Sequence, residues 1–235
     1  MIKASIFGDS ISTYEGYNPI GYNVFYNEQM QRSNGLNSVS DTWWYQVLKN
    51  MNYELCVNNS FSGCRISGYN FPSASSYQRI NDLKKETTIP DIILIYMGVN
   101  DFGYGIKIKN DFDNNIDLSC FEDSYDYMLK MIKKYYPNTK IVCATLLKGK
   151  VKDYEEWDFP DSPKGISFEE YNNTIRKIVT KENCMLADLA AYDIRYETLD
   201  GVHPTINGHK TIADVWIKEL KKQLINNSQV NGKHL

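Results

Sequence analysis

A chain of 235 residues is long enough to bury one substantial core and fits a single α/β domain. Its formal net charge of −3, without a block of like charges, argues against nucleic acid or an anionic membrane surface as a partner. The five cysteines form no Cys-x-x-Cys pair, so we expect free thiols, mostly in the core. No apolar run approaches the roughly 20 residues that span a bilayer, and we expect no cleavable signal segment, since it would have to include the first predicted strand. We therefore expect a soluble, cytoplasmic protein, unless a leader segment was removed.

The chain begins with an apolar run, residues 2–7, which predicts a strand that ends at Gly8-Asp9-Ser10. A serine at the carboxyl end of a parallel strand lies where open α/β sheets bind ligands. Ser10 is therefore the candidate nucleophile. A Gly-Asp-Ser tripeptide is common enough by chance that this assignment depends on partners elsewhere in the chain.

Residues 14–37 are rich in Tyr, Asn and Gly and follow neither a helical nor a strand period. They predict a long loop, and long loops in compact domains are often lids or binding rims. Its aromatic side chains would either line a substrate cleft or pack together to hold the loop down. These aromatic residues are Tyr14, Tyr17, Tyr22, Phe25 and Tyr26.

The rest of the chain alternates strands and helices, which predicts a doubly wound parallel sheet with helices on both faces. Asp41 is expected to cap a helix that packs through Trp43, Trp44, Val47 and Leu48. Further strands are predicted at 53–57, 92–97, 140–145 and 185–189, and further helices at 75–85, 121–136, 168–181 and 202–224. Residues 102–117 and 148–167 are expected to be irregular. The prediction is one domain over residues 1–225, followed by a polar, frayed tail over residues 226–235.

The segment Asp200-Gly201-Val202-His203 carries the candidate base. A carboxylate three residues before a histidine can hold its ring and fix which nitrogen carries the proton. Of the three histidines, His209 is expected on or partly under the surface of the last helix, and His234 lies in the tail. A serine hydroxyl becomes a good nucleophile when an imidazole takes its proton and a carboxylate stabilises the imidazolium. We assign these roles to Ser10, His203 and Asp200.

Three groups could stabilise the oxyanion that forms when a nucleophile attacks an ester carbonyl. They are the backbone N–H groups of Ser10 and Gly63 and the side-chain amide of Asn100. Each residue follows a predicted parallel strand, and the carboxyl ends of parallel strands share one edge of the sheet. Gly63 has an alternative explanation, because a glycine after a strand can simply supply a positive φ angle. We expect Asp9 to brace the turn by hydrogen bonding.

Four separated segments resemble the conserved blocks of the SGNH hydrolase superfamily, the GDSL-type esterases and lipases. They are Gly8-Asp9-Ser10, Gly63, Gly98-Val99-Asn100-Asp101 and Asp200-Gly201-Val202-His203. The resemblance implies a three-layer α/β/α sandwich with a five-stranded parallel sheet. It also implies that Ser10 is the nucleophile and first oxyanion donor, Gly63 and Asn100 the other donors, His203 the base and Asp200 its partner.

These observations predict a serine ester hydrolase for small acyl esters, with an acetylated carbohydrate as the favoured substrate. The alternatives are a lysophospholipase or thioesterase, a carbohydrate-binding protein that has lost turnover, and a domain that binds phosphate or flavin. The last lacks support, since the chain has neither a Gly-x-Gly-x-x-Gly motif nor a P-loop. We expect no metal and no cofactor. The predicted substrate rim consists of Tyr14, Tyr22, Tyr104 and Trp157.

Overall fold

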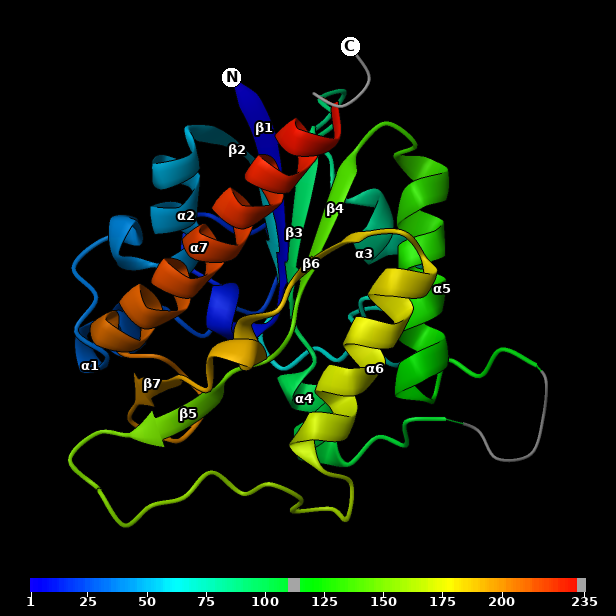
Figure 1. The fold of residues 1–235 in the computed structure, drawn as a ribbon. Helices are drawn as coiled ribbons and strands as arrows, with labels where there is room; N and C mark the ends of the chain where they lie inside the picture. The colour runs from blue at the N-terminus through cyan, green and yellow to red at the C-terminus, as the bar shows by residue number, and fades with distance from the viewer. Residues whose placement is uncertain (110–114, 232–235) are drawn as a thin grey trace.

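A five-stranded parallel sheet forms the centre of the computed structural model, which describes residues 1–109 and 115–231 (Figure 1). The strand order is β2-β1-β3-β4-β6. This is a doubly wound order, in which the chain starts at the inner strand β1, moves to the edge strand β2, and then crosses to the other edge through β3, β4 and β6. The strands are β1 (Ile2–Gly8), β2 (Tyr53–Ser60), β3 (Ile92–Tyr96), β4 (Lys140–Ala144) and β6 (Met185–Ala187).

Helices cover both faces of the sheet, which confirms the predicted three-layer α/β/α fold (Figure 1). On one face, α2 (Trp43–Met51) packs against α7 (Ile206–Asn231), and the rings of Trp43 and Trp216 stack with their centroids 5.3 Å apart. The other face is covered by α3 (Tyr77–Asn81), α5 (Phe121–Tyr135) and α6 (Phe168–Lys181).

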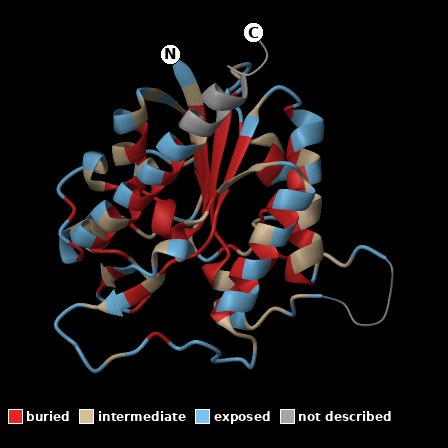
Figure 2. Ribbon diagram, viewed as in Figure 1, coloured by how far each residue is buried: buried red, intermediate tan, exposed pale blue. Residues whose placement is uncertain are grey.

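The central strand β3 is buried along its whole length (Figure 2). Its sequence, Ile-Ile-Leu-Ile-Tyr, is apolar at every position because neighbours lie on both sides and helices lie on both faces. Burial on this scale is the main favourable term in folding. The packing of β3 against its neighbours fixes where β1 and β3 end at the edge of the sheet, and so where the turns that follow them lie.

Four local predictions in the first third of the chain are corrected by the structure. The predicted loop 14–37 contains a short helix, α1 (Glu28–Ser33), which Asn27 caps. Thr42 rather than Asp41 caps α2, because Asp41 ends a 3-10 turn and its carboxylate accepts the N–H groups of residues 37 and 38. In addition, β2 runs on to Ser60, and α3 is shorter than the predicted helix 75–85.

The predicted irregular segments also contain regular structure. Helix α4 (Val99–Tyr104) occupies the start of the region predicted as a loop, whose residues 110–114 lie outside the described residues. Two short strands that the sequence did not indicate, β5 (Lys148–Val151) and β7 (Arg195–Thr198), pair in parallel. Helix α7 continues to Asn231, so residues 226–231 are helical rather than frayed, and residues 232–235 lie outside the described part.

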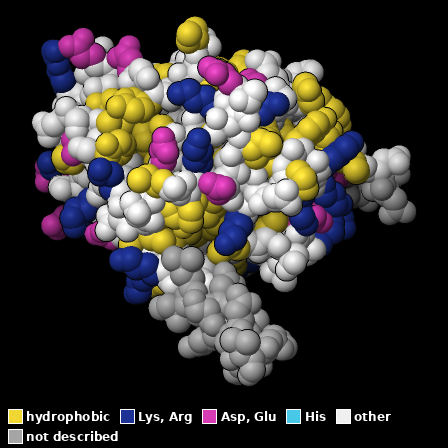
Figure 3. Space-filling view, turned by 90° about the horizontal axis from the view of Figure 1, so that it is seen from above, with side chains coloured by type: hydrophobic (Ala, Val, Ile, Leu, Met, Phe, Trp, Pro, Cys, Tyr) yellow, Lys and Arg dark blue, Asp and Glu magenta, His cyan; other side chains and the backbone are white. Residues whose placement is uncertain are grey.

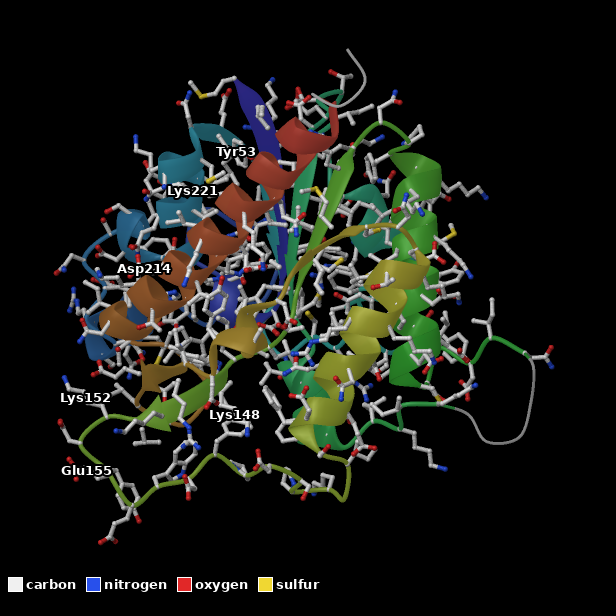
Figure 4. All side chains as sticks on the ribbon, viewed as in Figure 1. Tyr53, Lys148, Lys152, Glu155, Asp214 and Lys221 are labelled. Carbon is white, nitrogen blue, oxygen red and sulfur yellow. The ribbon has the colours of Figure 1, made fainter. Side chains whose placement is uncertain are left out.

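The β5–β7 ribbon lies beyond the carboxyl ends of the sheet and supports the segment that carries His203 (Figure 1). Gly149 in β5 is in such close contact with Gly201 that a Cβ atom at position 149 would overlap the Gly201 carbonyl oxygen. The segment after β5, labelled in Figure 4 at Lys152 and Glu155, is tied back by an ion pair of 2.5 Å between Lys148 and Asp161. None of the described helices is long and apolar enough to cross a membrane.

Candidate active site

A serine, a histidine and an aspartate form a continuous hydrogen-bonded chain at the carboxyl edge of the sheet. The Oγ of Ser10 lies 3.0 Å from Nε2 of His203, although the two residues are 193 positions apart in the sequence. On the other side of the ring, Nδ1 of His203 lies 2.6 Å from Oδ2 of Asp200. The structure therefore brings together the three side chains that the sequence assigned to nucleophile, base and orienting acid.

The carboxylate of Asp200 is held in place by its own turn. Its Oδ1 accepts the backbone N–H groups of Val202 and His203 at 3.0 and 2.8 Å, which leaves Oδ2 free for the imidazole. Burial raises the pKa of Asp200, but the hydrogen bonds and the charge of His203 outweigh it and bring the pKa down to about 2. Asp200 is therefore an anion at neutral pH, as is needed to fix Nδ1 as a hydrogen-bond donor.

The turn that carries Ser10 is a single 3-10 turn, Ser10–Ser12, directly after β1. Asp9 caps this turn, since its Oδ1 accepts the backbone N–H of Ile11 at 3.1 Å, which confirms the predicted brace. Burial raises the pKa of Asp9 to about 7. The first N–H groups of a helical turn have no partner within the turn, and the Ser10 N–H is one of these.

Strand register places the other two candidate donors near this turn. Gly8 pairs with Ser60 of β2 on one side and with Tyr96 of β3 on the other. Gly63 follows β2 by three residues and Asn100 follows β3 by four. All three strand ends therefore meet at one level of the sheet edge.

Gly63 and Asn100 have the local geometry that donors require. Gly63 has φ +79°, a conformation that favours glycine, and its N–H makes no hydrogen bond with any described residue. Asn100 lies in the first turn of α4, and one N–H of its amide donates to the carbonyl of Cys64 at 2.8 Å. That bond orients the amide and leaves its second N–H available.

The imidazole ring of His203 also stacks on Phe25, which lies in the long segment after the Ser10 turn. The rings of Phe25 and His203 are stacked, with centroids 3.4 Å apart and planes 7° apart. Phe25 is one of the aromatic residues that the sequence predicted either to line a cleft or to hold the loop down. No sequence signal pairs it with a histidine that lies so far along the chain.

A buried arginine, Arg79, lies below the same edge of the sheet, and the sequence did not indicate its role. Arg79 is fully buried and pairs with no carboxylate among the described residues. Its guanidinium donates to the carbonyl oxygens of Gly8, Asn59 and Pro72 and to the side chain of Asn59. Arg79 thus ties β1, β2 and the loop after Gly63 together just below Ser10.

The four residues predicted for the substrate rim have different surroundings. Tyr14 is a correction, because it is only 7% exposed and packs in the core. Tyr22 packs over Arg79, and Trp157 lies against Gly201, where a Cβ atom would come within 2.7 Å of the indole. Tyr104 is 67% exposed and lines a cavity of about 490 Å³ that also includes Gly63.

The other described histidine and the other large cavity lie apart from this chain of hydrogen bonds. His209 is fully buried, whereas the sequence predicted a position on the helix surface or partly buried, and its Nδ1 accepts the N–H of Trp43 at 3.2 Å. A cavity of about 560 Å³ at the opposite edge of the sheet, lined by residues such as Ile2, Tyr53 and Met185, includes no serine or histidine. Figure 3 looks onto the molecule from that side and shows hydrophobic side chains mixed with charges of both signs.

Comparison with known proteins gives one matching family model and several solved structures. Residues 2–156, which include Ser10, Gly63 and Asn100, match the model of the GDSL-like Lipase/Acylhydrolase family. A candidate GDSL-like lipase from Bacteroides ovatus is 30% identical, with 95% of this chain and 99% of that chain covered and a TM-score of 0.70. A second one from Bacteroides uniformis is 26% identical, with 94% and 96% covered and a TM-score of 0.67.

A solved structure with lower sequence identity has the same fold. A carbohydrate acetylesterase family member from Sinorhizobium meliloti is 12% identical, with 95% of this chain and 99% of that chain covered and a TM-score of 0.61. At this identity the comparison concerns the fold alone. None of the curated proteins matches the chain.

Proposed function

Because the chain belongs to the GDSL-like lipase/acylhydrolase family and is thus a hydrolase, we propose that it cleaves small acyl esters by a Ser-His-Asp mechanism. The observation that carries this proposal is the hydrogen-bonded chain from Ser10 through His203 to Asp200. Each of these groups is inert by itself. In this order they convert a neutral hydroxyl into a nucleophile.

In the first half of the reaction, Oγ of Ser10 bonds to the ester carbonyl carbon while Nε2 of His203 takes the hydroxyl proton. The imidazolium is stabilised by the anionic Asp200, whose low pKa keeps it ionised. When the tetrahedral intermediate collapses, the bond from carbon to the alcohol oxygen breaks and Nε2 returns its proton to the leaving alcohol. An acyl group then remains on Ser10.

Stabilisation of the oxyanion falls to the N–H groups of Ser10 and Gly63 and the amide of Asn100. These donors are already oriented before substrate binds, because the 3-10 turn, the positive φ of Gly63 and the bond from Asn100 to Cys64 fix them. Fixed donors need no reorganisation when charge develops, and each is typically worth about 2.7–4 kcal/mol of barrier.

In the second half, water attacks the acyl-enzyme and His203 takes its proton as general base. The same oxyanion donors act again. The acid leaves, and the proton returns from Nε2 to Oγ of Ser10. The catalyst is restored without any added group.

Within this class we favour an acetylated carbohydrate as substrate. The cavity next to Gly63 has a volume of about 490 Å³, and exposed aromatic rings line it. Tyr69 is 60% and Tyr104 67% exposed, and such rings can pack against the apolar face of a sugar. The fold that the chain shares with a carbohydrate acetylesterase family member agrees with this choice but does not determine it.

Hydrolysis of p-nitrophenyl acetate tests the proposal. We expect the wild-type protein to release p-nitrophenol and the Ser10→Ala variant to lose all but a trace of this activity. Ser33→Ala, at an exposed position on α1, is the matched control and should keep wild-type rates. Equal rates for wild type and Ser10→Ala would refute the role of Ser10, and an inactive wild type would favour a binding protein on the same fold.

A further inference from the structure

The cavity that contains Gly63 carries a positive charge at its wall, and we call it the Arg65 pocket. It measures about 490 Å³, within the range of sites for small organic ligands. Gly63 lines the pocket and is also one of the proposed oxyanion donors, so a ligand in the pocket would lie beside the reacting carbonyl. Other residues that line it include Arg65, Tyr69, Asn70, Phe71 and Tyr104.

Arg65 lies in the wall of this pocket, close enough to the buried Asp101 to lower the pKa of that carboxyl against the larger, raising effect of burial, but it forms no ion pair with a described residue. Its guanidinium lies over the ring of Tyr104, 5.4 Å from the centroid, and the side chain is half-buried. A guanidinium is always charged and offers donors in a planar fork that fits a carboxylate.

The carboxylates that touch residues of the pocket wall are already engaged elsewhere. Asp101 is fully buried, and its two oxygens accept the N–H groups of Ile66 and Ser67 at 2.8 and 2.9 Å. Asp117 accepts hydrogen bonds from Tyr69 and Ser119. None of the described residues that line the pocket is acidic. The charge of Arg65 is therefore available to a ligand.

We propose that the Arg65 pocket binds a carboxylate of the substrate, so that the ester this protein hydrolyses is an acid as well as an ester. The inference rests on the proposed function and specifies its substrate class. One guanidinium surrounded by neutral aromatic and amide groups matches the single charge of a carboxylate. The pocket adjoins the oxyanion donors, so the carboxylate belongs to the same molecule as the scissile ester, either on its acyl side or on its alcohol side.

Two pairs of esters that differ only in charge test the proposal and distinguish the two sides. For the alcohol side, 4-acetoxybenzoate is compared with neutral 4-acetoxybenzamide. For the acyl side, mono-p-nitrophenyl adipate is compared with its methyl ester. The measured quantity is the ratio of kcat/KM for the anionic ester to that for its neutral partner, because intrinsic reactivity cancels when this ratio is compared between variants.

We expect the ratio in one pair to fall by about tenfold or more in Arg65→Gln, as a lost charge-assisted hydrogen bond predicts. Arg65→Lys keeps the charge without the fork and should fall between wild type and Arg65→Gln. Arg32→Gln removes an equal charge from an exposed site on α1 and should keep the wild-type ratio. Thermal unfolding of each variant checks that the pocket variants are folded.

The outcomes separate this inference from the proposed function. If wild type hydrolyses the neutral esters but Arg65→Gln leaves both ratios unchanged, the Arg65 pocket does not bind a carboxylate, while the ester hydrolase proposal stands. A proportional loss on anionic and neutral esters has the same meaning, since it gives Arg65 a structural role only. If wild type hydrolyses none of the four esters, both proposals fail.

Discussion

The stacking of Phe25 on His203 predicts a catalytic effect that depends on the charge of the imidazole. The two rings lie face to face, with centroids 3.4 Å and planes 7° apart. Two neutral aromatic rings disfavour a direct face-to-face arrangement, because both faces carry negative charge density. A cation over the face of a ring is attracted instead. Phe25 should therefore stabilise the imidazolium more than the neutral imidazole, and the imidazolium forms as Ser10 attacks.

The size of the effect follows from how far the pair is removed from water. Cation–π contacts contribute about 0.5–1 kcal/mol at exposed sites and about 2 kcal/mol when desolvated. The side chain of His203 is 18% exposed, which places the pair between these limits. A loss of about 1 kcal/mol from the transition state lowers kcat about fivefold.

Steady-state hydrolysis of p-nitrophenyl acetate by three variants at position 25 measures the contribution of the Phe25 ring to catalysis. Phe25→Leu keeps the apolar volume without the ring, and we expect kcat to fall about fivefold with little change in KM. Phe25→Tyr keeps the ring face and should stay near wild type. Pentafluorophenylalanine at position 25 keeps the shape but reverses the charge on the ring face, so its kcat should fall at least as far as that of Phe25→Leu.

The backbone contacts of Phe25 remain in all three forms, since its N–H donates to Oγ1 of Thr13 at 3.0 Å. A change in kcat therefore reports on the ring. If the fluorinated form keeps wild-type kcat while Phe25→Leu loses it, Phe25 only fills space beside His203 and the electrostatic reasoning is wrong.

Four further predictions concern the oxyanion donors, the support of the base, and two buried titratable groups. Asn100→Ala should lower kcat about 10²–10³-fold with KM nearly unchanged, and a change confined to KM in the same assay would contradict the donor role. Gly149→Ala should lower both kcat and the unfolding temperature, because a Cβ there displaces Gly201, whereas Gly103→Ala, with open space around it, should change neither. Burial lowers the pKa of His209 to about 3, whereas in the unfolded chain this histidine binds a proton below about pH 6.5. The free energy of unfolding of the wild type should therefore fall by up to about 1.4 kcal/mol per pH unit as the pH falls below about 6.5. Urea unfolding of His209→Gln should not show this loss. Burial raises the pKa of Asp9 to about 7, so wild type should lose stability as the pH rises from about 4 to 7, and Asp9→Asn should not; identical pH profiles for the variant and wild type would contradict this assignment.

The parts of the site that lie at strand ends could be predicted from the sequence, for a physical reason. Parallel strands bring their carboxyl ends to one edge, so a polar residue that follows an apolar run must lie near that edge wherever it stands in the chain. Strand ends, which can be recognised in the sequence, are therefore enough to group Ser10, Gly63 and Asn100. The same rule carries no information about His203, which follows a short ribbon strand outside the main sheet.

Contacts made by side chains between distant segments could not be predicted in this way. The burial of Arg79 depends on four acceptors from three separate segments, and nothing around position 79 in the sequence indicates them. Strands β5 and β7 were missed because they are four residues each and polar at several positions. Such strands pair because the surrounding fold brings them together, and propensity alone does not decide the outcome.

The aromatic segment after the Ser10 turn also acquires a different role from the one its composition indicates. Thr13 at its start accepts the N–H of Phe25, Phe25 stacks on His203, and the Tyr26 hydroxyl donates to the carbonyl of Pro204 at 2.7 Å. Near its end, the carbonyl of Asn34 accepts the first N–H of α7. These contacts join the turn that carries the nucleophile to the turn that carries the base. A change at Phe25 or Tyr26 should therefore alter the alignment of Ser10 with His203, and so kcat, before it alters which ester is bound.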